Sequence, residues 1–233
     1  MQLNGDWQRE RMQAHALGSA RVIQLVAVQC SDTILRAASL MAETFRSGGK
    51  VLLCGNGGSA ADCQHMAAEL VSRLTADFER PGLPAIALTT DTSFLTAFAN
   101  DCGYEGIFAR QVQALGRPGD LLIGISTSGS SANVVRAVEL ARRTAMHTVV
   151  LTGAGGRLVE IADVAIAVPS ANTQYVQEAH LMIEHILCDL AERHLFGEQG
   201  DGRRHEGIRH APAPVVGPAD NIGAASERGG EPR

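Results

Sequence analysis

Five short runs of aliphatic residues lie between residues 51 and 168, and none of them alternates between apolar and polar positions. Strands that are buried on both faces have this continuous pattern, which is typical of parallel sheets. The segments between the runs carry apolar residues at helical spacing instead. The pattern predicts an α/β fold with a doubly wound, five-stranded parallel sheet flanked by helices. The five runs are Val51–Cys54, Ala85–Leu88, Leu121–Ile125, Thr148–Leu151 and Val164–Val168.

Six helical segments are predicted around these strands. The first has more apolar surface than one sheet layer covers, so we expect it to contact another subunit. The helices are expected at residues 19–47, 59–73, 93–115, 131–143, 156–162 and 173–196.

The two ends of the chain differ in composition from the middle. Residues 1–18 are polar and are expected to form a loose lead-in to a single domain at residues 19–197. The segment 198–233 is rich in proline, glycine and arginine and has hardly any large apolar residue. Such a segment buries too little surface to order itself, so we expect a disordered tail.

Composition and charge exclude several classes of protein. A net charge of −5 and 4% aromatic residues argue against a nucleic-acid partner. Five scattered cysteines without a C-x-x-C pair, a polar N-terminus and no long apolar stretch predict a cytoplasmic protein that does not bind a membrane. Lys50 is the only lysine, and its place beside two glycines before the first strand indicates a structural role.

Two polar loops follow predicted strands, where ligands of open α/β sheets bind. Asn56, Gly57 and Gly58 form a tight turn that a purely structural role explains equally well. The loop 126–133, Ser-Thr-Ser-Gly-Ser-Ser-Ala-Asn, is more informative. It combines five hydroxyls, a glycine and a helix N-terminus, which together suit a phosphate monoester.

Two helices carry further candidate groups. His65 and Glu69 are four residues apart and therefore share one helix face, as an acid–base pair or as metal ligands. On the last helix, Gln177 and His185 could both reach one cleft, and His180 with Glu184 offers an equally good pair. The spacing alone does not choose between these two pairs.

Taken together, these motifs resemble the phosphoheptose isomerase family within the sugar isomerase (SIS) domain superfamily. The resemblance covers residues 21–196 and includes His65-x-x-x-Glu69, Asn100-Asp101-x-Gly103-Tyr104 and Gln177-Glu178-Ala179-His180. It implies isomerisation of sedoheptulose 7-phosphate to D-glycero-D-manno-heptose 7-phosphate by a homotetramer with active sites between subunits. Ser130 departs from the family pattern, which often has asparagine there.

The resemblance also implies a role for each matching residue. Glu69 and His185 would be the acid–base residues, and His65, Glu69, Gln177 and His185 would hold one zinc ion per subunit. A glutamine amide is an unusual zinc ligand, and a zinc-bound carboxylate is a weaker base. The residues implied to bind the sugar phosphate are Asn56, Gly57, Gly58, Glu69, Asn100, Asp101, Ser126, Thr127, Ser128, Ser131 and Gln177.

Two alternative functions remain open from the sequence. One is a non-catalytic SIS tetramer that binds a replication initiator protein. The other is an isomerase of a different ketose phosphate in secondary metabolism. The combination of His65, Glu69, Gln177 and His185 favours an enzyme over a binding module.

Overall fold

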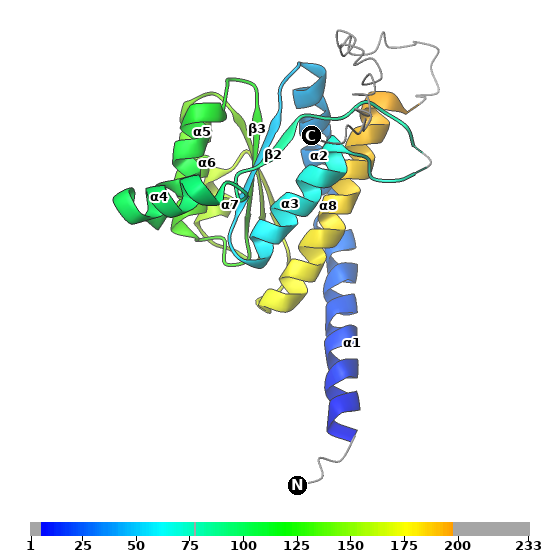
Figure 1. Ribbon diagram of the computed structural model, residues 1–233. Coiled ribbons are helices and arrows are strands. Elements are labelled where there is room, and N and C mark those ends of the chain that lie inside the picture. The colour runs from blue at the N-terminus through cyan, green and yellow to red at the C-terminus, as the bar shows by residue number, and fades with distance from the viewer. Residues whose placement is uncertain (1–5, 77, 198–233) are drawn as a thin grey trace, which may run out of the picture. The chain divides into compact units, whose positions relative to one another are not determined.

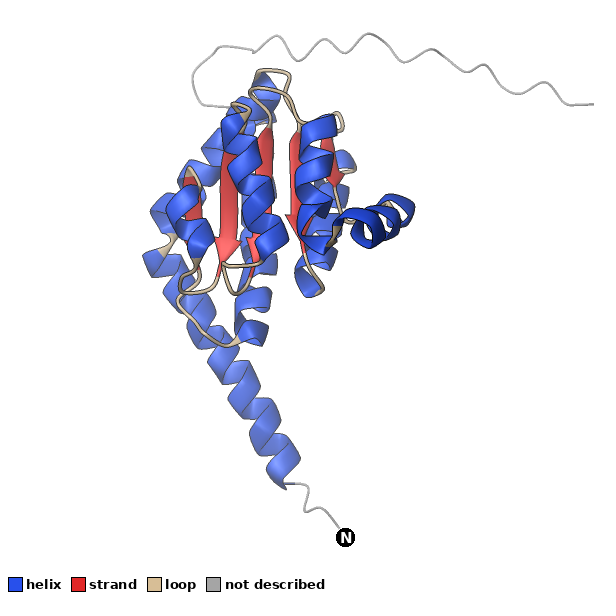
Figure 2. Cartoon of the chain, turned by 90° about the vertical axis from the view of Figure 1, so that its left-hand side faces the viewer, coloured by secondary structure: helices blue, strands red, loops and turns tan. Residues whose placement is uncertain are grey.

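A computed structural model describes residues 6–76 and 78–197. Its centre is a five-stranded sheet in the order β2-β1-β3-β4-β5, in which every neighbouring pair is parallel. Figure 2 shows these strands between two layers of helices. The predicted fold class is confirmed. The strands are β1 (Val51–Gly55), β2 (Ala85–Ala87), β3 (Leu121–Ser126), β4 (His147–Thr152) and β5 (Val164–Ala167).

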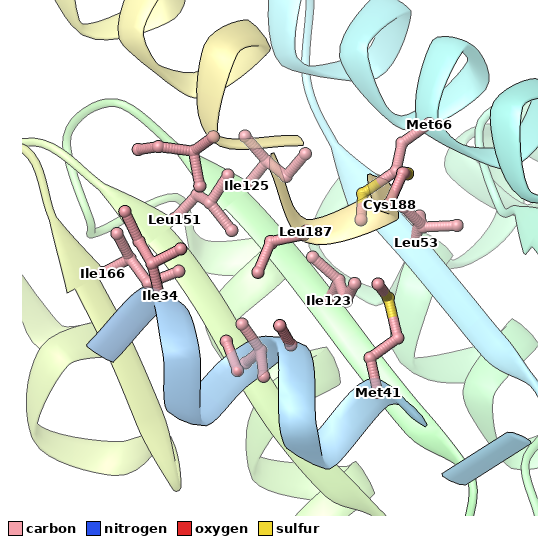
Figure 3. Close-up of a cluster of buried hydrophobic side chains, with 14 of the residues drawn as sticks. Ile34, Met41, Leu53, Met66, Ile123, Ile125, Leu151, Ile166, Leu187 and Cys188 are labelled. Atoms are coloured by element: carbon pink, nitrogen blue, oxygen red, sulfur yellow. The ribbon is translucent and has the colours of Figure 1, made fainter. Parts of the chain in front are cut away.

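The two faces of the sheet belong to two separate apolar cores. Successive side chains of β1 alternate between them, since Val51 and Leu53 face one core and Leu52 and Cys54 the other. Because both faces are buried, the strand sequences are mostly apolar, and their polar residues lie at the strand ends, as in β3 and β4. Helices α2, α3 and α8 cover the first face and α4 to α7 the second, while α1 packs on α8 and α2 and projects beyond the sheet (Figure 1). Figure 3 shows the first core, where Leu187 of α8 lies among side chains from the sheet and α2.

The helices follow the predicted order with different boundaries at two places. The single helix expected at 93–115 is interrupted at Gly103, which has a φ of 91° that ends α4 and starts a 3₁₀ turn, η1. The helices on this face are α4 (Thr92–Cys102), η1 (Tyr104–Gly106), α5 (Ile107–Leu115), α6 (Ala132–Arg143) and α7 (Arg157–Ile161). Those on the other face are α1 (Asp6–Gln29), α2 (Ser31–Arg46), α3 (Gly58–Val71) and α8 (Thr173–Phe196).

The N-terminal prediction was wrong in two respects. From Asp6 onward the expected loose lead-in is helical, and α1 packs on the start of α8, where His15 lies 2.7 Å from Glu178. The expected continuous helix at 19–47 also breaks at Cys30. The Ser31 hydroxyl donates to the Ala27 carbonyl, and such a side-chain bond competes with the helical ladder and bends it.

Lys50 forms an ion pair with Asp120, Nζ to Oδ2 at 2.5 Å, just before β1 and β3 begin. This contact confirms the structural role expected for the lone lysine.

Among the residues described, no single helix is long and apolar enough to cross a membrane. Helices α1 and α2 reach the required length and apolar composition only when they are counted together, and a bend of 72° separates them. The tail predicted at 198–233 lies outside the described residues.

Candidate active site

The serine-rich loop follows β3, at the carboxyl end of a central strand. Its hydroxyls are bonded to one another, with Ser126 Oγ 2.9 Å from Ser131 Oγ and 3.3 Å from Ser128 Oγ. Ser131 is the N-cap residue of α6, but its side chain makes no bond to the helix amides because it is turned to Ser126. The first amides of α6 and the loop hydroxyls therefore lie together, as an anion site requires.

Backbone contacts hold this loop against the loop after β4. Gly129 has a φ of 63°, and a Cβ at this position would overlap the carbonyl oxygen of Gly155. Gly156 likewise leaves no room, because its Cβ would lie 2.5 Å from the Ser128 carbonyl oxygen. The Gly153 amide donates to the Thr127 carbonyl at 3.1 Å. Two glycine-rich turns thus pack backbone to backbone, which fixes the hydroxyls before any ligand arrives.

A pair of amide side chains joins the loops after β1 and β3. Asn56 and Asn133 exchange two hydrogen bonds of 2.8 Å each, and the Tyr104 hydroxyl donates to Asn56 Oδ1 at 3.0 Å. These two strands are neighbours in the sheet, and the strand order reverses between them. That reversal is where open α/β sheets bind ligands.

The structure brings the two helices with candidate acid–base groups into contact. His65 of α3 and His185 of α8 face each other, Nε2 to Nε2 at 2.9 Å, with their rings edge to face. Glu69 Oε1 lies 3.7 Å from His65 Nε2. Glu69 and His185 also line one open pocket of about 510 Å³, together with Leu74, Thr75, Ile186, Asp189 and Leu190.

Gln177 connects this cluster to the first polar loop. Its side-chain amide lies against Gly58, so closely that any Cβ at Gly58 would overlap it. Gly58 is the first residue of α3, the helix that carries His65 and Glu69. The groups predicted on residues 56–58, 65–69 and 177–185 therefore lie along the same interface, between α3 and α8.

The structure also separates the two pairs on α8 that spacing could not distinguish. His180 and Glu184 are fully buried, and His180 Nε2 lies 3.1 Å from the Thr152 carbonyl oxygen at the end of β4. Burial lowers the pKa of His180 to about 4. Burial, and then the nearby Asp62 carboxylate, raise the pKa of Glu184 to about 9. Both side chains are neutral near pH 7 and belong to the core, whereas Gln177 and His185 face α3.

The buried imidazole of His180 predicts a pH-dependent stability. The pKa of His180 is about 4 in the folded protein and about 6.5 in the unfolded chain, so the unfolded chain binds a proton more readily. The contribution of His180 to the free energy of unfolding is therefore fully present above about pH 6.5 and is lost as the pH falls toward 4. We expect wild type to lose about 1–2 kcal/mol more than His180→Gln between pH 7.5 and pH 5. Urea unfolding at both pH values measures the difference, and equal losses in the two proteins would contradict it.

Two further predicted binding residues lie at the end of α4, shortly before Tyr104. Asn100 and Asp101 are exposed at the end of α4, and their side chains are hydrogen bonded to each other at 2.8 Å. Conversely, no individual role was predicted for Asn133, Tyr104 or Gly156, which the structure places at the loops of this region. Gly156 has a φ of 108°, and its position in a glycine pair after a predicted strand is the one signal that could have identified it.

The predicted zinc site is only partly organised. As the side chains stand, no three His, Cys, Asp or Glu groups within residues 6–76 and 78–197 are placed to hold a metal ion. The donor types nevertheless suit zinc, which takes imidazole nitrogen and carboxylate oxygen. The two imidazole nitrogens are 2.9 Å apart, a little closer than the roughly 3.3 Å between two nitrogen ligands of one tetrahedral zinc ion.

The parallel sheet and its phosphate-suited loop define a domain of the SIS class. Residues 17–153 match the SIS domain family. A phosphoheptose isomerase from Roseiflexus sp. (strain RS-1) is 61% identical over 166 residues, which are 71% of this chain and 83% of the relative.

Two solved structures are also similar. The phosphoheptose isomerase from Neisseria gonorrhoeae has a TM-score of 0.74 and 45% identity, covering 79% of this chain and 98% of that one. The one from Francisella tularensis has a TM-score of 0.77 and 39% identity, covering 80% and 98%. The chain belongs to the phosphoheptose isomerase family. It is therefore an enzyme, an isomerase of sugar phosphates, and not the non-catalytic binding module.

Proposed function

We propose that this enzyme converts sedoheptulose 7-phosphate to D-glycero-D-manno-heptose 7-phosphate. The observation that supports this most directly is the meeting of His65, Glu69 and His185 beside one pocket, connected through Gln177 and Gly58 to the polar loops. The similarity to relatives named phosphoheptose isomerase favours a seven-carbon substrate over another ketose phosphate.

The loop after β3 is proposed to bind the phosphate. Ser126, Thr127, Ser128 and Ser131 supply hydroxyl donors, and α6 adds backbone amides and the positive end of its dipole. In the same proposal, the turn at Asn56, Gly57 and Gly58 contacts the sugar, and its glycines allow close approach of the backbone. The phosphate then anchors one end of an extended sugar whose other end reaches the histidine cluster.

The isomerisation requires two proton transfers. One proton leaves a carbon of the open-chain sugar and returns to the neighbouring carbon through an enediol(ate), and we assign this transfer to the Glu69 carboxylate. A second proton moves between the two oxygens, which we assign to His185. Separate groups suit the two tasks, because a carboxylate and an imidazole differ in basicity and in the states they adopt near neutral pH.

We also propose that zinc binds to His65, Glu69, Gln177 and His185. When bound, zinc polarises the substrate carbonyl and stabilises negative charge on its oxygen. The donor types and the short distance between the imidazole nitrogens support this assignment. Elemental analysis of the purified protein should find about one zinc per chain, and His65→Ala should lower that content strongly. Equal zinc in both proteins would remove His65 from the ligand set.

A homotetramer with active sites between subunits is proposed for the assembly. Helix α1 supports it, because Trp7, Met12, Leu17 and Val28 are large apolar residues exposed along its length. A neighbouring subunit packed against α1 would remove these side chains from water. Analytical ultracentrifugation measures the mass directly, and a monomer at micromolar concentration would contradict the proposal.

The substrate assignment is tested by incubating the protein with sedoheptulose 7-phosphate and identifying the product by NMR. We expect the aldose heptose 7-phosphate to accumulate to an equilibrium mixture. Parallel incubations with fructose 6-phosphate and ribulose 5-phosphate serve as comparisons. If the enzyme converts fructose 6-phosphate or ribulose 5-phosphate faster than sedoheptulose 7-phosphate, the proposed substrate is wrong.

A further inference from the structure

Arg80 lies in the loop between α3 and β2 and has no role in the chemistry above, yet its side chain is fully buried. Its guanidinium forms an ion pair with Glu192 of α8, and Nε donates to Glu192 Oε1 at 2.8 Å. The Glu192 side chain is 3% exposed. A buried charge pair of this kind needs many hydrogen bonds to offset its lost hydration.

The remaining guanidinium donors supply those bonds at the end of α3. The NH2 group donates to the Glu69 carbonyl at 2.8 Å, and NH1 donates to the carbonyls of Leu70, Ser72 and Pro81 at 2.8 to 3.2 Å. The last carbonyls of a helix have no partner within it. Arg80 therefore closes the last turn of α3 and simultaneously ties that turn to α8.

Both helices that Arg80 joins carry a proposed acid–base group, Glu69 in the last turn of α3 and His185 near the middle of α8. The NH2 group of Arg80 binds the backbone of Glu69 itself. Glu192 is seven residues beyond His185, two turns along the same face of α8. Glu192 also accepts from the amide of Leu74 at 3.4 Å, and Leu74 lines the pocket of Glu69 and His185.

We propose that Arg80 is a positioning residue for the isomerisation. Through its ion pair with Glu192, Arg80 fixes the position of Glu69 on α3 relative to His185 on α8. This inference rests on the proposed acid–base roles of Glu69 and His185. An arginine is needed to bind the Glu192 carboxylate and the carbonyls at the end of α3 at the same time. A lysine ammonium has only three donors on one nitrogen and cannot reach both groups of acceptors.

The test measures kcat and KM of Arg80→Lys, a variant that keeps the positive charge but loses the arginine fork. If Arg80→Lys does not fold, Glu192→Gln is measured instead, because glutamine keeps one acceptor oxygen. The phosphate loop is held independently, so kcat should fall about 10- to 100-fold while KM stays within about twofold. The matched control is Asp120→Asn, which breaks the ion pair with Lys50 at the amino ends of β1 and β3 and touches neither Arg80 nor Glu192. It should lower Tm without changing kcat. Unchanged kcat in Arg80→Lys, or an equal loss in the control, would overturn the inference.

Crystal structures separate this inference from the proposed function. We expect the contact between His65 and His185 to be kept in wild type and lost in Arg80→Lys, with the sheet and the phosphate loop unchanged. An unaltered contact in the variant rejects the positioning role, whatever the activity. If wild type fails to convert sedoheptulose 7-phosphate, the substrate proposal is wrong, and the measured contact still decides the role of Arg80.

Discussion

Glu69→Gln is expected to lower kcat about 10²- to 10⁴-fold, the range that a positioned general base contributes. The amide keeps the shape of the side chain but takes up no proton. His185→Gln should cause a loss of similar size, because its amide is a poor proton carrier between the two substrate oxygens. Initial rates with sedoheptulose 7-phosphate, followed by NMR, measure both effects.

A nearby carboxylate provides the control for this prediction. Glu178 lies on the same helix as His185, but it is exposed and paired with His15. Glu178→Gln should therefore leave kcat within about twofold of wild type, as surface substitutions usually do. If Glu69→Gln or His185→Gln turns over substrate at a near wild-type rate, the assignment of that residue is wrong.

Gly129→Ala is expected to destabilise the protein by about 2–4 kcal/mol, through left-handed backbone strain and overlap with the Gly155 carbonyl. The two loops must separate to admit the methyl group, which displaces the serine hydroxyls. We therefore also expect KM for the sugar phosphate to rise about 10- to 100-fold, the cost of losing one or two charge-assisted hydrogen bonds.

Gly155→Ala is the matched variant for this prediction. Gly155 lies in the facing loop, but no heavy atom lies within 4 Å of where its Cβ would be. Its stability should remain within about 0.5 kcal/mol of wild type, with an unchanged KM. Urea unfolding and initial rates test both variants. Equal behaviour of the two would show that the backbone packing of Gly129 does not hold the phosphate loop.

The strands were predictable from the sequence because a parallel sheet buried on both faces needs uninterrupted aliphatic runs. All five runs became strands, although Leu88 and Val168 lie outside β2 and β5. The convergence of His65, Glu69 and His185 was predictable only in part. Helical spacing placed groups on the same faces, but the choice between His185 and His180 depended on how α8 is rotated, which is set by packing.

Other features depended on tertiary contacts that leave no local trace. The break at Cys30 follows a hydroxyl bond that a polar residue inside a helix does not always make. Arg80 is one arginine in an irregular loop, and nothing nearby in the sequence indicates that a glutamate more than a hundred residues later will pair with it. The partners of Asn56 are also distant in the sequence, since Tyr104 is 48 and Asn133 is 77 residues further along the chain.

Helix α8 supplies two of the four proposed zinc ligands, and it is the last helix of the described chain. During synthesis, the sheet and the phosphate loop are therefore made before Gln177 and His185. A chain that stops short of α8 also exposes the core that Leu187 fills, and such unfinished chains aggregate readily. With the roles proposed for Gln177 and His185, turnover requires translation to proceed through α8, and products terminated before it are expected to be inactive.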